Sequence, residues 1–355
     1  MKISVISFTE TGMGLSERLP ELIDAECELF TKCSTGTDRV SAIAEKIPYV
    51  KECISDWAGE QMRQRKALLF IGACGIAVRA IAPHVTDKLH DSPVLVMDEG
   101  GGYVIPILSG HVGGANELAG QIAQKTGAVA VITTATDLHQ LFAVDIFAKK
   151  NNLFIENKDG IARVSAKLLA GEEITMSVER GHLLPDSVLP EQIRIISYPP
   201  TEAVDVLIAS QPEREAVLVL RPKEYIIGMG CRRGKEAEKI EAFVLRSLEC
   251  ARIKIQQVAA LATIDIKSRE EGLLTWCRKE RVPFLTYTAK ELNEVSGRFQ
   301  TSAFVEEKVG TDNVCERSAL RACGENGKLV YEKHAEDGMT IAIAKQVWSV
   351  TFDET

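Results

Sequence analysis

Residues 68–75 read LLFIGACG, an apolar run that ends in small residues, and three later stretches repeat this pattern. They are VLVMDEGGG at 94–102, YVIPILSGHVGG at 103–114 and VAVITTATD at 129–137. Short apolar runs bounded by turn residues are typical of buried strands. Because ligands of open α/β sheets bind beyond the carboxyl ends of the strands, the loops after these runs are the first candidates for a functional site.

The order of strand, glycine loop and helix predicts a mostly parallel, doubly wound sheet in the N-terminal part. Residues 1–23 follow this order, residues 68–85 repeat it, and residues 129–150 repeat it again if 141–150 form a helix. Such alternation indicates an α/β fold with helices on both faces of the sheet. The glycines at 100–102 predict one exception, an antiparallel hairpin between the two apolar runs of residues 94–108.

Three domains are expected from the remaining pattern and from the length of 355 residues. Residues 1–140 form the N-terminal α/β domain with the glycine-rich loops, and residues 141–221 form a small connecting α+β domain with strands near 172–179 and 192–197. Residues 222–355 form a second α/β domain. It opens with a strand at 225–227, continues with strands at 258–266 and 284–288, and ends in a hairpin of 328–334 with 339–345.

Composition limits the class of protein. The formal charge of -8 argues against a nucleic-acid or membrane-surface protein, because both need a broad basic face. The sequence has no apolar run close to the roughly 20 residues that cross a bilayer. Its nine cysteines include no C-x-x-C pair, and the start resembles no secretory signal. We therefore expect a soluble cytoplasmic protein with reduced thiols and no nucleic-acid or membrane partner.

The first candidate loop contains Gly72, Cys74 and Gly75 and precedes a helix whose first-turn N–H groups can bind an anion. Arg79 lies one turn further along this helix. A plainer interpretation is that the glycines fit a tight turn, that Arg79 is a solvated charge and that Cys74 is a small buried thiol.

The second candidate loop is centred on His111, whose imidazole can exchange a proton near neutral pH. Three glycines of the loop, Gly110, Gly113 and Gly114, let the backbone approach a ligand closely. Ser109, Asn116, Thr134 and Thr136 are expected to add polar contacts to the same ligand. Asp98 and Asp137 each end a strand, and we expect both at the same rim as His111. They would orient the imidazole or activate water, although aspartate after a strand is also a common turn former.

The third candidate loop, GMGCRRG at 228–234, misses the dinucleotide fingerprint by one residue. Arg232 and Arg233 beside a helix start instead suit a ligand rich in carboxylates, and a solvated basic turn is the alternative. Gly228, Gly230, Thr263 and Lys267 are expected to add contacts at this rim. The histidines have no zinc-site spacing, so we expect no metal bound by the protein.

Together these motifs resemble one known family. GACGIAVR at 72–79, DEG at 98–100, SGHVGGAN at 109–116 and TTATD at 133–137 are similar to motifs of the cobalt-precorrin-5A hydrolase family of anaerobic cobalamin biosynthesis. So are GMGCRRG at 228–234, LAT at 261–263 with Lys267, and VG at 309–310 with VCE at 314–316. The resemblance covers nearly the whole chain and is weakest at 151–221.

The resemblance implies hydrolytic opening of the ring A acetate δ-lactone of a cobalt-corrinoid intermediate. The two-carbon fragment leaves as acetaldehyde and the product is cobalt-precorrin-5B. The substrate carries the cobalt, so no cofactor is expected. Its many carboxylates would meet Arg79, Arg232 and Arg233, and we expect His111, oriented by Asp98 or Asp137, to activate the water.

Two other functions remain open. A corrinoid-binding or carrier protein without catalysis would need the same basic cleft, and a nucleotide-dependent enzyme would use the loop at 228–234. A homodimer and transient contacts with neighbouring pathway enzymes are further expectations.

Overall fold

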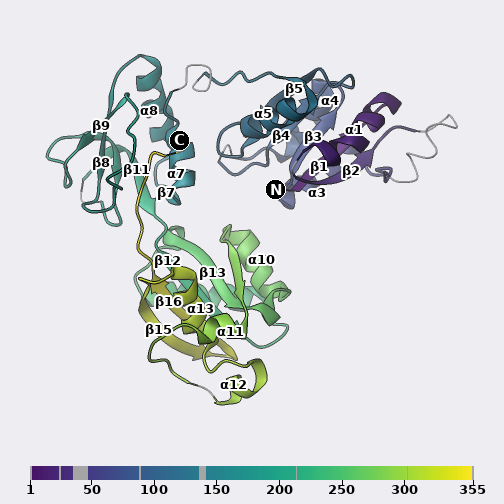
Figure 1. Cartoon of the computed structure of the whole chain (residues 1–355). Helices are drawn as coiled ribbons and strands as arrows, with labels where there is room; N and C mark the ends of the chain where they lie inside the picture. The colour runs from purple at the N-terminus through teal and green to yellow at the C-terminus, as the bar shows by residue number, and fades with distance from the viewer. Residues whose placement is uncertain are drawn as a thin grey trace. The chain divides into compact units, whose positions relative to one another are not determined.

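The computed structural model describes residues 2–23, 25–34, 47–87, 89–135, 141–212, 214–301 and 303–353. The chain divides into two compact units, Met1–Ile146 and Phe147–Thr355. The described residues form three sheets, one in the first unit and two in the second (Figure 1). This confirms the predicted α/β class with parallel-rich sheets. Within the described residues, no helix is long and apolar enough to cross a membrane.

The first unit is built on a six-stranded sheet with the order β2-β1-β3-β4-β5-β6. Its strands are β1 (Lys2–Ser7), β2 (Glu26–Thr31), β3 (Ala67–Ile71), β4 (Val94–Met97), β5 (Tyr103–Leu108) and β6 (Val129–Ala130). All neighbouring strands are parallel except β4 and β5, which pair antiparallel. The predicted hairpin is thus confirmed.

Helices cover both faces of this sheet, because successive residues of a buried strand face opposite sides. The helical segments are α1 (Glu10–Leu22), α3 (Ile54–Arg63), α4 (Cys74–Ile81), η1 (Ala82–His84) and α5 (Ala115–Thr126). A further helix, α7 (Val144–Lys150), spans the boundary between the two units, and its Phe147 stacks on Phe352. Leu69 and Ile71 pack with α1 and α5 on one face, whereas Leu68 and Phe70 pack with α3 and α4 on the other. The helix expected over 141–150 begins only at Val144.

The second unit begins with a five-stranded sheet of order β7-β11-β10-β8-β9, on which α8 (Asp159–Leu169) packs. Its strands are β7 (Leu153–Ile155), β8 (Ile174–Val178), β9 (Ile193–Ile196), β10 (Val204–Ile208) and β11 (Ala216–Pro222). The strands predicted near 172–179 and 192–197 correspond to β8 and β9.

The last sheet has the order β14-β13-β12-β16-β15 and belongs to what we call the C-terminal domain. Its strands are β12 (Tyr225–Cys231), β13 (Val258–Ile264), β14 (Phe284–Tyr287), β15 (Lys328–Glu336) and β16 (Met339–Lys345). Its helical segments are α9 (Ala237–Cys250), η2 (Ile255–Gln257), η3 (Asp265–Lys267), α10 (Glu271–Glu280), α11 (Ala289–Asn293), α12 (Ala303–Val309) and α13 (Val314–Cys323). β12, β13 and β14 are parallel, and β15 and β16 form the predicted hairpin.

Close packing of α13 on β12 depends on a glycine. A Cβ atom at Gly228 would lie 1.8 Å from the carbonyl oxygen of Cys315 on α13, a distance that no side chain can occupy. On the opposite face, α9 and α10 bury Phe243 and Trp276 against Ile227 and Met229. The sheet is therefore covered on both faces, and the carboxyl ends of its parallel strands point to one edge.

Candidate functional site

The antiparallel pairing of β4 and β5 divides the candidate loops of the first unit between two opposite edges of the sheet. β3 and β4 run in the same direction, so the loop of Gly72 and the turn of Asp98 lie at one edge, which we call the Gly72 rim. β5 returns in the opposite direction, and Leu108 pairs with Val94 at the start of β4. The loop of His111 therefore lies at the other edge, the His111 rim.

The expectation that Asp98 shares a rim with His111 is therefore wrong. The four residues of β4 alone span about 13 Å of strand. The Asp98 carboxylate accepts hydrogen bonds from the backbone N–H groups of Gly100, at 3.1 Å, and Tyr103, at 2.5 Å. Asp98 is thus a turn former in the β4–β5 hairpin, which was the plainer interpretation of its position.

At the Gly72 rim, α4 begins at Cys74, which is exposed, so the expectation of a buried thiol is wrong. Arg79 folds back on its own helix, and its Nη1 atom donates to the carbonyl oxygen of Gly75 at 3.0 Å. Binding of substrate by Gly72, Cys74, Gly75 and Arg79 stays a prediction.

At the His111 rim, the structure places a carboxylate beside the imidazole. Nδ1 of His111 lies 3.7 Å from Oδ2 of Asp145, and the two side chains are only 16% and 12% exposed. Asp145 lies in the first turn of α7, where an acidic residue is ordinarily explained by the helix macrodipole. The sequence pattern points to carboxylates at strand ends, and a first-turn helix residue such as Asp145 carries no comparable signal. The candidates Asp137 and Thr136 lie outside the described residues.

The loop that carries His111 is held at its start by Ser109. The Ser109 hydroxyl donates to the carbonyl oxygen of Asp91 at 2.9 Å, and its backbone adopts a positive φ of 56°. A Cβ atom at Gly113 would lie 2.6 Å from the carbonyl oxygen of Ser109, so only glycine lets the loop close on itself. Gly114, with a φ of 88°, then starts α5.

The end of the loop is held by Asn116, which is 9% exposed. Its Nδ2 atom donates to the hydroxyl oxygen of Thr134 at 3.1 Å, and a Cβ atom at Gly110 would lie 2.7 Å from its Oδ1 atom. The contacts of Gly110, Asn116 and Thr134 therefore fix the shape of the loop. His111 lies in this tightly closed turn.

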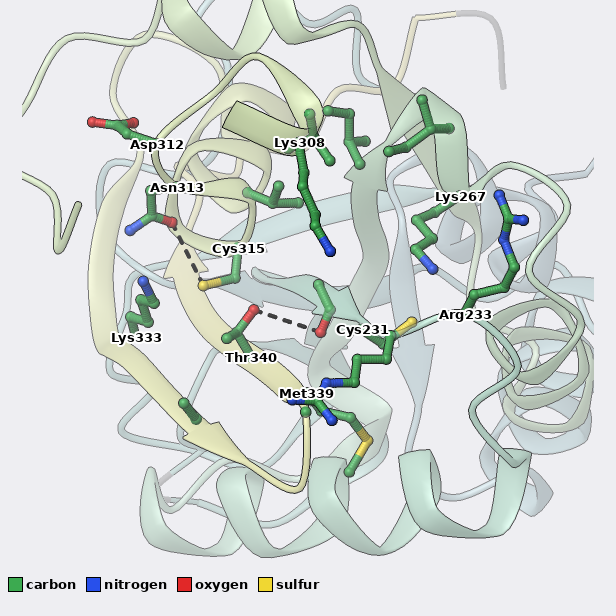
Figure 2. Close-up of a pocket in the computed structure, with 18 residues that line it drawn as sticks. Cys231, Arg233, Lys267, Lys308, Asp312, Asn313, Cys315, Lys333, Met339 and Thr340 are labelled. Carbon is green, nitrogen blue, oxygen red and sulfur yellow. Dashed lines mark hydrogen bonds between the residues drawn. The ribbon is translucent and has the colours of Figure 1, made fainter. Parts of the chain in front are cut away.

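A cavity of about 650 Å³ lies in the C-terminal domain, where β12 and β13 end and α13 begins (Figure 2). It includes four of the predicted residues, Gly230, Arg232, Arg233 and Lys267. Lys308 of α12 and Lys333 of β15 complete a set of five cationic side chains. Neither lysine was predicted from the sequence, because both belong to elements far along the chain from the loop at 228–234.

Apolar residues and two thiols line the remainder of this cavity, which we call the C-terminal pocket. Ile264, Val314 and Met339 are buried apolar residues of its wall. Burial raises the pKa of Cys231 to about 11, although Lys267 opposes the change, and burial also raises the pKa of Cys315 to about 11. Both are therefore neutral thiols near pH 7 and not nucleophiles.

Two residues expected to bind substrate here are structural instead. Thr263 is fully buried, and its hydroxyl donates to the carbonyl oxygen of Met229 at 2.6 Å. Gly228 is covered by α13, as its contact with Cys315 shows. Neither lines the C-terminal pocket as the structure describes it.

The carboxylate of Glu270, which follows η3, anchors the loop after β12. Lys267 Nζ lies 2.7 Å from Glu270, and the backbone N–H of Gly234 donates to the same carboxylate at 2.5 Å. Burial works against the charged form of Glu270, but these hydrogen bonds outweigh it and hold the pKa of the carboxyl below its ordinary value. Arg232 and Arg233 are thus presented by a loop with a defined anchor.

Comparison with known proteins identifies the family. The model described as Cobalamin synthesis G N-terminal matches residues 56–137, Cobalamin biosynthesis central region matches 142–222, and Cobalamin synthesis G C-terminus matches 225–344. The chain is 35% identical to a protein of Priestia megaterium named cobalt-precorrin-5A hydrolase, across 96% of this chain and 94% of the relative. It is 31% identical to a Salmonella typhimurium protein of the same name, across 96% and 97% of the two chains.

These matches confirm the resemblance seen in the sequence motifs, and they extend through the middle domain, where the motifs are weakest. The chain belongs to the cobalamin synthesis G family.

Proposed function

We propose that this protein is a cobalt-precorrin-5A hydrolase. It opens the ring A acetate δ-lactone of the cobalt-corrinoid, releases acetaldehyde and forms cobalt-precorrin-5B. The names of the relatives support the hydrolase class over nearly the whole chain. The observation that carries the hydrolytic step is the shielded pair of His111 and Asp145 at 3.7 Å. The work is done in the cytoplasm on a small molecule that brings its own cobalt.

His111 is the general base in this proposal. A carboxylate at Nδ1 favours the tautomer with its proton on that nitrogen, and Nε2 then holds the lone pair that takes a proton from water. Asp145 also stabilises the imidazolium that results. In this proposal the backbone N–H of Gly113, which belongs to the same loop and has no hydrogen-bond partner in the described part of the chain, receives the developing oxyanion.

The chemistry balances with one water molecule. The water oxygen bonds to the lactone carbonyl carbon, the acyl C–O bond breaks, and a carboxylate and a hydroxyl on the two-carbon fragment result. The hydroxyl then loses its proton and becomes a carbonyl as the carbon–carbon bond to the macrocycle breaks. The bonding pair stays on the macrocycle, which takes up a proton, so no oxidant or reductant is required.

The test is turnover of purified full-length protein with cobalt-precorrin-5A, with acetaldehyde trapped as a hydrazone and the product mass recorded. We expect stoichiometric aldehyde and the mass of cobalt-precorrin-5B. His111→Asn should abolish turnover and leave the dissociation constant of the substrate within about threefold, because the base acts in the transition state. Tight binding of the lactone without aldehyde would favour the carrier function and overturn the proposal.

A further inference from the structure

We propose that the C-terminal pocket is a binding site for the carboxylates along one edge of a tetrapyrrole-derived macrocycle. The natural ligand follows from the proposed function, but the binding chemistry is argued from the pocket alone. Its volume of about 650 Å³ is in the range of small-molecule sites. The pocket lies beyond the carboxyl ends of β12 and β13, the position expected of ligand sites in open α/β sheets.

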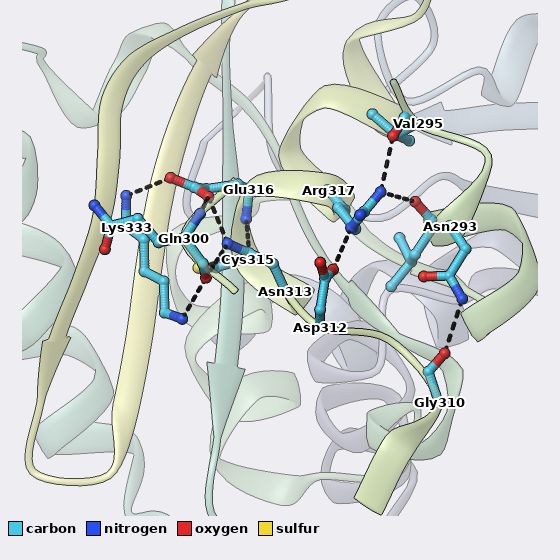
Figure 3. A network of polar contacts seen from close by, with 11 residues as sticks. Asn293, Val295, Gln300, Gly310, Asp312, Asn313, Cys315, Glu316, Arg317 and Lys333 are labelled. Atoms are coloured by element: carbon cyan, nitrogen blue, oxygen red, sulfur yellow. Dashed lines mark hydrogen bonds and ion pairs between the residues drawn. The ribbon is translucent and has the colours of Figure 1, made fainter. Parts of the chain in front are cut away.

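The charge of the pocket suits an anion with several carboxylates. Five cationic side chains line it, and Asp312 is the one carboxylate among the described lining residues. Asp312 is already paired, because Nε of Arg317 donates to its Oδ1 atom at 2.7 Å (Figure 3). Lys267 is likewise paired, with Glu270 at 2.7 Å, so the positive charge that a ligand meets comes chiefly from Arg232, Arg233 and Lys333.

Two of the cations have unused hydrogen-bond donors. In the part of the chain that the structure describes, the guanidinium groups of Arg232 and Arg233 make no hydrogen bond or ion pair, and both side chains are exposed. The backbone N–H of Arg232 donates to the carbonyl oxygen of Gly338 at 3.0 Å, which holds the loop against the β15–β16 hairpin. Guanidinium groups presented in this way match carboxylates with paired N–H bonds.

The opposite wall is built around a buried carboxylate. Glu316 is 2% exposed and accepts hydrogen bonds from the backbone N–H groups of Lys333, at 2.9 Å, and Gln300, at 3.1 Å, and from the side-chain amide of Asn313 (Figure 3). The Nζ atom of Lys333 donates to the carbonyl oxygen of Gln300 at 3.0 Å. Glu316 thus joins β15 to the start of α13 and places Lys333 at the pocket, where its Nζ atom makes no ion pair with any described carboxylate.

The apolar surface distinguishes a macrocycle from a nucleotide. Ile264, Val314 and Met339 give the ligand a nonpolar contact between the cations. α9, which follows the Arg232 loop, starts with Glu236 at its N-cap and Glu238 in its first turn. These two carboxylates occupy the positive end of the helix where a phosphate would bind.

The test compares two probes on full-length protein by calorimetry. Dicyanocobyrinic acid is a corrin with seven carboxylates, and its heptamethyl ester keeps the ring and removes the charges. We expect the acid to bind at least about tenfold more tightly than the ester, because charge-assisted hydrogen bonds are lost in the ester. We also expect its affinity to fall as salt rises. Equal affinity for acid and ester would overturn the proposal, as would displacement of the acid by micromolar ATP.

Substitutions of the lining residues test whether the acid binds in the C-terminal pocket. The double variant Arg232→Gln with Arg233→Gln should bind the acid at least about tenfold more weakly, and Lys333→Gln several-fold more weakly. Lys328→Gln is the matched control, because Lys328 is an exposed lysine of the same strand and does not line the pocket. Circular dichroism confirms that each variant is folded. If the pocket variants bind like the Lys328 variant, the site is elsewhere.

Aldehyde release from cobalt-precorrin-5A is measured separately. If the protein binds the acid as expected but releases no aldehyde, the binding site proposed here stands and the proposed hydrolase function fails. If the protein releases aldehyde, but its affinity for the acid does not change when Arg232, Arg233 and Lys333 are substituted, the hydrolase function stands and the binding site proposed here fails.

Discussion

The hydroxyl of Ser109 donates to the carbonyl oxygen of Asp91 across 2.9 Å, and this contact fixes the start of the His111 loop at the amino end of β4. Asp98 follows the carboxyl end of the same strand. The two aspartates near the ends of β4 therefore belong to different edges of the sheet. Asp98 is therefore not the partner of His111, and among the described residues the carboxylate of Asp145 on α7 lies 3.7 Å from the imidazole, which is why our proposal gives Asp145 that role.

Asparagine substitutions distinguish the proposed catalytic role of Asp145 from the structural role of Asp98. Asp145→Asn should lower kcat about 100-fold, within the range of acid–base contributions, with KM changed less than about threefold. Asp98→Asn should leave kcat within about threefold and destabilise the hairpin by about 1 kcal/mol, because its two bonds are structural. Steady-state kinetics and urea unfolding measure both. Asp159→Asn is the control for loss of a first-turn helix carboxylate. A lower kcat in the Asp98 variant alone would contradict this account.

Gly228→Ala should prevent normal folding of the C-terminal domain. The added Cβ atom would meet the backbone oxygen of Cys315 at 1.8 Å, and α13 cannot move away without exposing the face of β12. We expect a loss of at least about 3 kcal/mol in the free energy of unfolding. Gly120→Ala on α5 has open space and should instead stabilise by roughly 0.5–1 kcal/mol. Denaturant unfolding of both variants checks this, and similar stabilities would show that the packing argument is mistaken.

Iodoacetamide should distinguish the exposed thiols from those of the C-terminal pocket. At pH 7.5 we expect Cys74 to be modified well before Cys231 and Cys315, since burial raises the pKa of both pocket thiols to about 11. The rate at Cys231 should rise about tenfold per pH unit over the accessible alkaline range, as the thiolate fraction does. Peptide mass spectrometry follows each site. Rapid labelling of Cys315 at neutral pH would be incompatible with its burial.

Glu270 should make stability depend on pH in the acid range. Its folded-state pKa is lowered, so its contribution is present above the unfolded-state pKa and is lost as pH falls through the folded-state pKa. Glu270→Gln should cost about 1–3 kcal/mol at pH 7, because the variant weakens the bonds to Lys267 and Gly234. The difference from the unmodified protein should shrink near pH 3. Urea titrations at the two pH values give this difference, and a gap that persists in acid would argue against the carboxylate as its cause.

Much of the fold follows from the sequence because local patterns decide it. The glycines at 100–102 predict the β4–β5 hairpin, and the apolar run at 225–227 predicts β12. The same hairpin implies that β5 runs antiparallel to β4. The loops after these two strands therefore lie at opposite edges of the sheet, and the prediction that all four N-terminal loops share one edge is inconsistent with the predicted hairpin. The direction of each strand, as well as its position, decides which loops meet.

The candidate sites are predicted less completely because their residues come from distant elements. The loop at 228–234 reveals Arg232, Arg233 and Gly230 through local composition, but Lys333 reaches the C-terminal pocket only through the pairing of β15 with β16. Thr263 shows the opposite error. Its polar side chain at a strand end suggests a ligand contact, whereas α13 and the neighbouring strand bury it completely. Burial is a long-range property that composition alone does not specify.

The most direct test of the central claim is turnover of cobalt-precorrin-5A in ¹⁸O-labelled water, with the mass of the corrinoid product recorded by mass spectrometry. If water attacks the lactone carbonyl, cobalt-precorrin-5B gains one heavy oxygen in its ring A acetate, and the His111→Asn variant forms no such product. A product that carries no heavy oxygen, or an unchanged rate in the His111→Asn variant, would contradict hydrolysis by a water molecule activated at His111.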